Sequence, residues 1–149
     1  MIAFRDATEA DLAVVVSLLA DDAMGRVRED AGPPLPDAYG AGFRAMVAQG
    51  GRIILMVDGL DVVACAQLHI LHGLSTKGMP RAQVEAVRVV GTRRGEGLGG
   101  LLLRQVIAEA QAAGCGVVQL TTHRSRMDAQ RFYRVLGFVE SHAGMKLAL

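Results

Sequence analysis

The sequence is poor in the residues that build covalent or metal-linked frameworks. Its 149 residues include only two cysteines, Cys65 and Cys115, which are far apart and form no Cys-x-x-Cys or Cys/His spacing. This scarcity argues against a disulfide framework and against a zinc site. It is typical of a chain that folds in a reducing cytoplasm, so we expect a cytoplasmic protein without a bound metal.

Long hydrophobic runs are also missing. The longest apolar stretch near the N-terminus, residues 12–20, is interrupted by Ser17 and is preceded by Asp and Glu instead of Lys and Arg. A membrane-spanning helix needs about 20 apolar residues, and a signal peptide begins with positive charges. The sequence therefore predicts neither a signal peptide nor a transmembrane helix.

A large excess of charge of one sign is lacking as well. The net charge is +1, with 51% apolar and 21% charged residues, which indicates a globular chain and argues against disorder and bulk nucleic-acid binding. The total hides an asymmetry, because residues 1–50 carry four arginines against eight acids, whereas residues 81–134 carry nine arginines against four acids. Either the second half meets an anion, or these arginines lie on solvated helix faces.

Apolar periodicity and turn residues predict one domain, residues 1–149, of alternating helices and strands. Strands are expected at residues 2–5, 52–57, 62–71, 83–90 and 117–121, with one or two more in residues 138–149. Helices are expected at residues 8–20, 37–49, 97–113 and 127–136. This order predicts a mixed α/β domain whose first half is largely antiparallel.

A glycine-rich segment between a predicted strand and a predicted helix carries the clearest functional signal. It reads Arg93-Arg94-Gly95-Glu96-Gly97-Leu98-Gly99-Gly100. Glycines let the backbone approach a ligand closely, and the free N–H groups of the first helical turn favour phosphate oxygens. A plain turn accounts for one or two glycines but not for four with two arginines at the entry. We therefore predict an anion-binding cradle.

Two familiar nucleotide sites fit this segment poorly. Gly95, Gly97 and Gly100 satisfy the spacing G-x-G-x-x-G. That fingerprint belongs to the first strand–helix unit of a parallel sheet and has an acid about 20 residues later. Here some ninety residues precede the segment, and residues 120–122 include no acid. A P-loop needs Gly-Lys-Ser/Thr, which residues 99–101 do not provide.

The segment resembles the acetyl-CoA motif of the GNAT superfamily of N-acetyltransferases, Gln/Arg-x-x-Gly-x-Gly/Ala, which residues 94–99 match at every fixed position. Residues 84–89 resemble that family's fourth strand, and residues 129–138 resemble its Ala-x-x-Phe-Tyr-x-x-x-Gly-Phe segment. The two motifs lie at the family's usual separation, and the resemblance covers nearly the whole chain. It implies a central mixed sheet whose fourth and fifth strands splay apart, flanked by helices.

The resemblance implies acetyl-CoA as the cosubstrate, held without a metal. Backbone groups of Val87 and Val89 would bind the pantetheine arm. The cradle for the pyrophosphate would consist of Arg94, Gly95, Glu96, Gly97, Leu98, Gly99 and Gly100. Arg126 departs from the family pattern, because many members have Asn at that position. An arginine can still reach a phosphate or a pantetheine carbonyl, so Arg126 is a candidate cofactor contact; the alternative is that Arg124 and Arg126 are exposed charges.

Two residues are candidates for proton transfer. Glu85 stands on the strand beside the splay, where similar enzymes often carry an acid, and would be the general base for the amine. Its alternative role is a strand-surface carboxylate or a partner of Arg88. Tyr133 matches the family's tyrosine that faces the CoA sulfur and would be the general acid for the thiolate. Its alternative role is packing beside neighbouring aromatic rings. An oxyanion donor would be a backbone N–H of residues 87–89.

The implied activity is acetyl transfer from acetyl-CoA to a primary amine of a small molecule or peptide, by direct attack in a ternary complex. The competing hypothesis is a non-catalytic acyl-CoA-binding sensor. The acceptor stays open, because residues 24–39, where selectivity is expected, contain both acids and arginines. The strand with Glu85 is also similar to that of amino-sugar phosphate and aminoalkylphosphonate acetyltransferases. Acetyl-CoA and an amine are the expected partners, without nucleic acid or membrane, and a homodimer is left open.

Overall fold

The computed structural model describes residues 1–149, which form two compact units, residues 1–119 and residues 120–149. The first unit contains the strands β1 (Ile2–Asp6), β2 (Arg52–Asp58), β3 (Asp61–Leu71), β4 (Arg81–Val89) and β5 (Val117–Gln119). Its main helices are α1 (Leu12–Ala20), α2 (Ala23–Arg28), α3 (Asp37–Ala48) and α5 (Leu98–Ala112), with short helical turns at Glu9–Asp11, Ser75–Gly78 (α4) and Gly91–Arg93. The second unit contains α6 (Met127–Val135). The single domain expected from the sequence stays a prediction.

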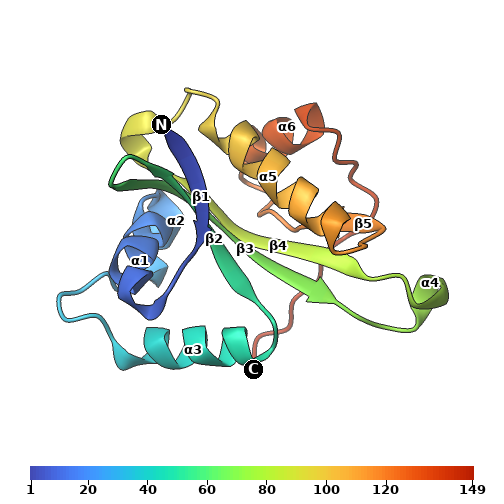
Figure 1. The fold of residues 1–149 in the computed structure, drawn as a ribbon, viewed down its shortest axis with the longest axis horizontal. Helices are drawn as coiled ribbons and strands as arrows, with labels where there is room; N and C mark the ends of the chain where they lie inside the picture. Colours follow the sequence, from blue (N-terminus) through green and yellow to red (C-terminus); the bar gives the residue numbers. More distant parts are fainter. The chain divides into compact units, whose positions relative to one another are not determined.

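The first unit is built on one five-stranded sheet in the order β1-β2-β3-β4-β5. Neighbouring strands from β1 to β4 pair antiparallel, whereas β5 joins β4 in parallel. A parallel neighbour requires a crossover, and α5 provides it between β4 and β5. The predicted mixed sheet with an antiparallel first half is therefore confirmed (Figure 1).

The sheet is covered on both faces in its middle. Consecutive residues of β2 and β3 are buried, which a strand shows only when side chains on both faces are shielded. α1 and α5 lie on opposite sides of the sheet and supply this cover (Figure 1). On the α1 side, one cluster of buried residues consists of Val15, Leu18, Ile53, Leu55 and Cys65. Burial raises the pKa of the Cys65 thiol to about 12.

The chain enters α1 through a network centred on Asp11. Its carboxylate accepts hydrogen bonds from the Thr8 backbone N–H at 2.7 Å and from the Arg5 guanidinium at 2.8 and 2.9 Å. The bonds from Arg5, with those from Thr8, hold the pKa of the Asp11 carboxyl well below its usual range. The sequence predicts that Thr8 caps this helix; in the structure Thr8 instead precedes the short turn Glu9–Asp11, and the Asp11 side chain reaches back to its N–H.

Most predicted elements are present, with boundaries within four residues of those expected, but two parts of the chain differ from the expectation. The α2 helix was not predicted, since six residues are too few to show a helical period. The strands expected in residues 138–149 were wrong, because this segment contains no strand. β-branched and apolar residues favour an extended chain, but a strand forms only where another strand pairs with it.

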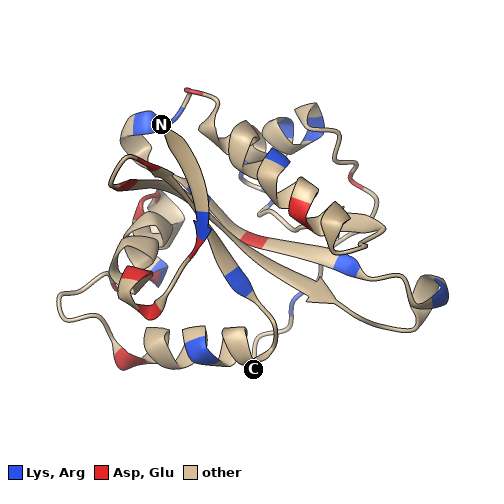
Figure 2. Ribbon diagram, viewed as in Figure 1, with Lys and Arg blue, Asp and Glu red and all other residues tan.

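The charge asymmetry of the sequence has a counterpart in the fold. Acidic residues of the first fifty lie around α1 and at the start of α3, as Figure 2 shows.

No helix is long and apolar enough to cross a membrane. The predicted cytoplasmic location stays a prediction.

Candidate functional site

The glycine-rich loop between β4 and α5 has the backbone geometry of a ligand cradle. Gly95 and Gly97 both lie in the left-handed region, with φ of 87° and 81°. A Cβ atom added at either position would have no atom within 4 Å. The loop therefore needs glycine for its backbone conformation, and the space beside these residues is open to a bound molecule.

The first turn of α5 presents backbone donors next to this loop. Gly97 precedes the first residue of the helix and has no side chain to cap it. The first turn is closed by a hydrogen bond from the Leu101 N–H to Gly97 O at 3.2 Å. The N–H groups of Leu98, Gly99 and Gly100 precede that bond and point out of the helix at its positive end. Phosphate oxygens fit this arrangement, so the residues present suit the pyrophosphate of acetyl-CoA.

The two arginines at the entry of the loop are held by protein groups. The guanidinium of Arg93 contacts Glu96 at 2.7 Å and Asp58 at 3.0 Å, and these carboxylates raise its pKa, Glu96 most. Arg94 donates from Nε to Val89 O at 3.3 Å and from Nη2 to Asp21 O at 2.6 Å. The arginine and glutamate side chains thus shape the loop, and the backbone amides after Arg94 are the candidate ligand contacts.

β4 has a long unpaired edge beside this loop. It pairs with β5 only over Arg81–Gln83, opposite Val117–Gln119, yet the strand continues to Val89. Residues 84–89 thus have a partner on the β3 side and none on the β5 side. This geometry corresponds to the splay that the family resemblance implies.

The hydrogen-bond pattern shows which residues face the open edge. Val90 donates its N–H to Val63 O of β3 at 2.9 Å. Because successive residues of a strand direct their backbone groups to opposite edges, Val89 and Val87 direct theirs away from β3. These are the two residues whose backbone was expected to bind the pantetheine arm, and the structure places both at the unpaired edge.

A bulge interrupts β4 at the middle of this edge. Gln67 pairs with Glu85 and Cys65 pairs with Arg88, so two residues of β4, Ala86 and Val87, face one residue of β3. Ala86 has φ of 53°, an uncommon conformation for alanine. Bulges increase strand twist and are enriched near active sites. We attribute the departure of β4 from β5 to this twist.

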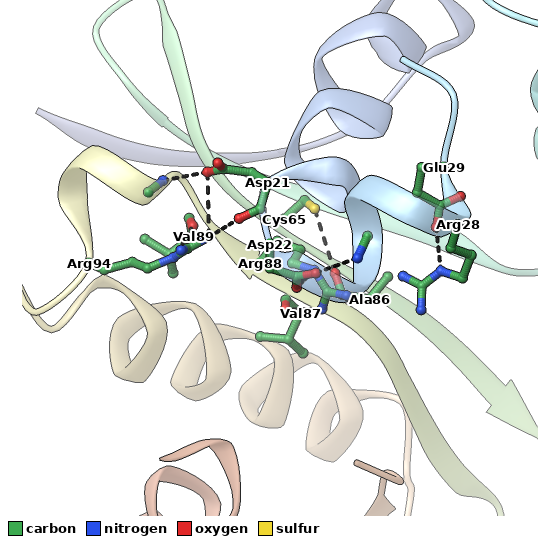
Figure 3. Close-up of polar contacts among 12 residues, drawn as sticks. Asp21, Asp22, Arg28, Glu29, Cys65, Ala86, Val87, Arg88, Val89 and Arg94 are labelled. Carbon is green, nitrogen blue, oxygen red and sulfur yellow. Dashed lines mark hydrogen bonds and ion pairs between the residues drawn. The ribbon is translucent and has the colours of Figure 1, made fainter. Parts of the chain in front are cut away.

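Arg88 and Asp22 lie beside the open edge, although no sequence pattern indicates them. Asp22 caps α2 by accepting the Gly25 N–H at 2.6 Å, and its other carboxylate oxygen lies 3.5 Å from Arg88 Nε. Arg88 also donates from Nη1 to Val87 O at 2.9 Å (Figure 3). The pair joins the start of α2 to the open edge of β4. A charged pair 66 positions apart leaves no local pattern in a sequence.

Glu85, the candidate base, lies on the same strand as the open edge. Its side chain is exposed, and its carboxylate accepts a hydrogen bond from Gln67 Nε2 at 3.3 Å. Both the catalytic role and the surface role fit this position. Its closeness in the chain to Val87 is what favours the catalytic role.

The second unit holds the remaining two candidates. Tyr133 lies on α6 between Phe132 and Phe138, with ring centroids 5.1 and 5.7 Å away. Phe138 donates its N–H to Tyr133 O at 3.0 Å. Arg126 precedes the first residue of α6 and accepts the Gln130 N–H through its carbonyl. These contacts fix the start and end of the helix, and the roles of Tyr133 and Arg126 stay predictions.

Comparison with known proteins identifies the family. The model of the acetyltransferase (GNAT) family matches residues 18–138, most of the chain, including the loop and the open edge. The chain therefore belongs to the GNAT family, as the resemblance predicted. The match confirms the expected acetyltransferase (GNAT) domain within the chain.

Three relatives illustrate the match. The aminoalkylphosphonate N-acetyltransferase of Salmonella typhimurium (strain LT2) is 33% identical over 92 residues, which are 60% of this chain and 57% of that enzyme. The chain thus matches little more than half the length of this relative. A transcriptional regulator from Bacillus halodurans C-125 superposes with a TM-score of 0.95 and 38% identity, covering 100% of both chains. A putative acetyltransferase from Agrobacterium tumefaciens C58 superposes with a TM-score of 0.81 and 31% identity, covering 99% of both chains.

Enzymes of this family use acetyl-CoA as the acetyl donor. The glycine loop and the open edge of β4 suit its pyrophosphate and its pantetheine arm. In the structure, no group of three or more His, Cys, Asp or Glu side chains is arranged to hold a metal ion.

Proposed function

We propose that this domain transfers the acetyl group of acetyl-CoA to the primary amine of a small molecule, by direct attack in a ternary complex. The observation that carries the proposal is the continuity of two features. The unpaired edge of β4 leads through a short turn into the left-handed glycines and the uncapped start of α5. An extended amide chain can bind to such an edge as an added strand, with its phosphates at the helix start.

The binding roles follow from these features. The backbone of Val87 and Val89 binds the pantetheine amides, and the amides of residues 94–100 bind the pyrophosphate. A hydrogen bond to a charged group contributes about 1.5–3 kcal/mol, so a few aligned amides suffice to anchor the cofactor without a lysine. Arg126 is the further candidate for a phosphate or pantetheine contact, on the strength of the family resemblance.

The chemical roles are assigned to three kinds of group. Acetyl-CoA, when bound, supplies an acetyl thioester. Glu85 accepts a proton from the acceptor ammonium, so that the neutral amine forms the new C–N bond as the C–S bond breaks. A backbone N–H of residues 87–89 donates to the carbonyl oxygen, and Tyr133 gives a proton to the departing sulfur. The tyrosine regains its proton from the amine nitrogen by way of solvent.

For the acceptor we favour a small amine that carries an anionic group. The support is the similarity to an aminoalkylphosphonate N-acetyltransferase, together with Arg26 and Arg28 in the last turn of α2. Both arginines are exposed, and Arg28 is paired with Glu29 at 2.7 Å. The acidic residues around α1 instead favour a cationic acceptor. An assay that compares anionic with cationic amines therefore distinguishes the two acceptor classes.

A thiol-release assay tests the proposal directly. Purified protein and acetyl-CoA are combined with matched acceptors, such as 2-aminoethylphosphonate against propylamine, and with a polyamine and a lysine peptide. We expect the phosphonate to react with the highest kcat/KM. Preference for the polyamine would overturn the acceptor class, and the absence of thiol release with every amine would overturn catalysis.

The second candidate function is a non-catalytic acyl-CoA sensor. One observation favours it, since the Bacillus halodurans protein that superposes over the full chain is a transcriptional regulator. The two candidates differ in one measurement. A sensor binds CoA without releasing thiol, whereas the enzyme does both. A homodimer stays a prediction under either function.

A further inference from the structure

Asp21 connects the end of α1 to the loop between β4 and α5. It is the first residue after α1, and its carboxylate Oδ2 accepts the Gly91 backbone N–H at 2.7 Å. The Arg94 guanidinium donates from Nη2 to the Asp21 carbonyl at 2.6 Å and lies 3.4 Å from Oδ2 (Figure 3). One residue therefore holds both ends of the four-residue turn that leads into the cradle.

The Asp21 carboxylate lies so close to Gly91 that a side chain at residue 91 would displace it. A Cβ atom added to Gly91 would lie 2.9 Å from Asp21 Oδ2, which is shorter than such contacts normally are. Gly91 opens a helical turn, where the first N–H groups have no partner within the turn. The Asp21 carboxylate accepts the Gly91 N–H, and the missing side chain at Gly91 leaves room for the carboxylate to approach.

Arg94 extends the connection to the end of β4. Its Nε donates to Val89 O at 3.3 Å while its Nη2 contacts Asp21. The guanidinium thus spans the last residue of the open edge and the end of α1, and the Arg94 backbone N–H closes the turn by donating to Gly91 O at 3.5 Å. The relative position of Val89 and the loop amides depends on this bridge.

We propose that Asp21 is a positioning residue for the cofactor cradle. Its carboxylate acts through the Gly91 N–H at 2.7 Å and, at 3.4 Å, through the Arg94 guanidinium, which the backbone carbonyl of residue 21 also holds. These contacts fix the turn so that the amides of residues 95–100 are aligned before acetyl-CoA arrives. Alignment in advance raises affinity because less ordering is needed on binding. The inference rests on the proposed function, in which this loop binds the pyrophosphate.

The test compares four proteins: the native chain, Asp21→Asn, Asp21→Ala and the control Glu9→Ala. Glu9 forms an exposed ion pair with Arg44 at 3.0 Å, comparable in exposure to the Asp21–Arg94 pair and outside the site. We expect Asp21→Ala to weaken CoA binding about tenfold in calorimetry. It should also raise the KM for acetyl-CoA by a similar factor and leave kcat and the acceptor KM unchanged. Asp21→Asn, which keeps one acceptor oxygen, should fall between native and Asp21→Ala.

Two further readouts separate positioning from general structure. Exposed ion pairs contribute little to global stability, so the thermal midpoint of Asp21→Ala should stay close to that of Glu9→Ala. Amide exchange of residues 95–100 in the protein without cofactor should become faster in Asp21→Ala alone. Native affinity in Asp21→Ala, or loss of affinity accompanied by an equal loss in Glu9→Ala, would overturn the positioning role. Failure of the native protein to bind CoA would instead overturn the proposed function.

Discussion

Arg88 and Asp22 form an ion pair that joins the open edge of β4 to the first turn of α2, with 3.5 Å between Arg88 Nε and Asp22 Oδ2. Only 11% of the arginine side chain and 24% of the aspartate side chain are exposed. Shielded pairs are screened less by salt than surface pairs. The helix that the family resemblance associates with acceptor selection is therefore fixed to the strand proposed to bind the cofactor.

Gly97→Val should abolish CoA binding. The substitution places a β-branched side chain at φ of 81° and fills the space proposed for the phosphates. Native protein at a hundredfold excess of CoA over Kd should gain about 2.7 kcal/mol in the free energy of unfolding, and the variant should gain none. Thermal denaturation with and without CoA measures both.

The control for Gly97→Val is Gly50→Val in the turn between α3 and β2. Gly50 has a matching φ of 82° and open space around it, so this variant has a similar backbone penalty away from the site. It should bind CoA like the native protein. Unchanged CoA binding by Gly97→Val would contradict the cradle assignment.

Tyr133→Phe should separate chemistry from binding. The change removes only the hydroxyl and leaves the ring contacts with Phe132 and Phe138. We expect CoA affinity to be preserved and kcat to fall by a factor of about 10² to 10⁴, the usual contribution of a general acid. Steady-state kinetics with a confirmed acceptor give kcat, and calorimetry gives the affinity. Normal turnover would show that the tyrosine only packs.

Glu85→Gln should produce a defect that depends on pH. A lysine-like amine has a pKa of about 10.4 and needs a base most at low pH. The variant should therefore lose most activity near pH 6 and recover part of it as the pH rises toward the pKa of the amine. A pH profile of kcat/KM for native and variant measures this. Activity without a pH-dependent defect would favour the surface role for this carboxylate.

Asp11→Asn should lower stability at neutral pH but not in acid. The pKa of Asp11 is lowered in the folded protein, whereas an unfolded aspartate has a pKa near 3.9. Its contribution to stability is thus present above about pH 4 and is lost as the pH falls through the lower folded value. Urea midpoints of native and variant should differ at pH 7 and converge toward pH 2. A constant difference would contradict the linkage.

Cys65 should be unreactive in the native state. Only 1% of the residue is exposed, and its pKa is raised to about 12, so thiolate is scarce at pH 8. A thiol reagent such as DTNB should label Cys115, which is partly exposed, and label both cysteines only in denaturant. Rapid reaction of two thiols in the native protein would show that the core near Cys65 opens readily.

Much of the fold could be predicted from local patterns. The hairpin of β2 and β3, the glycines before α5 and the apolar stripe of that helix each specify their own structure within a few residues. The strands expected in residues 138–149 failed because pairing is not a local property. α2 was missed because six residues are too few to show a helical period.

Only the part of the candidate site that is built from backbone groups could be predicted from the sequence. Val87, Val89 and the loop of residues 94–100 lie where the resemblance indicated, because strand edges and helix starts follow from the chain itself. Asp21, Asp22 and Arg88 act through partners some 66 to 73 positions away, so no spacing in the sequence reveals them. The bulge has a weak signal in the sequence, because the apolar residues at 84, 86, 87 and 89 break the strict alternation of a strand.

The extra residue in β4 also decides which charges share a face of the sheet. In a regular strand Glu85 and Arg88, three positions apart, would point to opposite faces. The bulge changes the phase of the strand by one, so that Glu85 pairs with Gln67 and Arg88 with Cys65, two residues on the same side of β3. Cys65 packs with Val15 and Leu18 of α1, which identifies that side. Because of the extra residue, the face of the sheet on the α1 side carries both the Glu85 carboxylate and the Arg88 guanidinium. In a regular strand these two charges would lie on opposite faces.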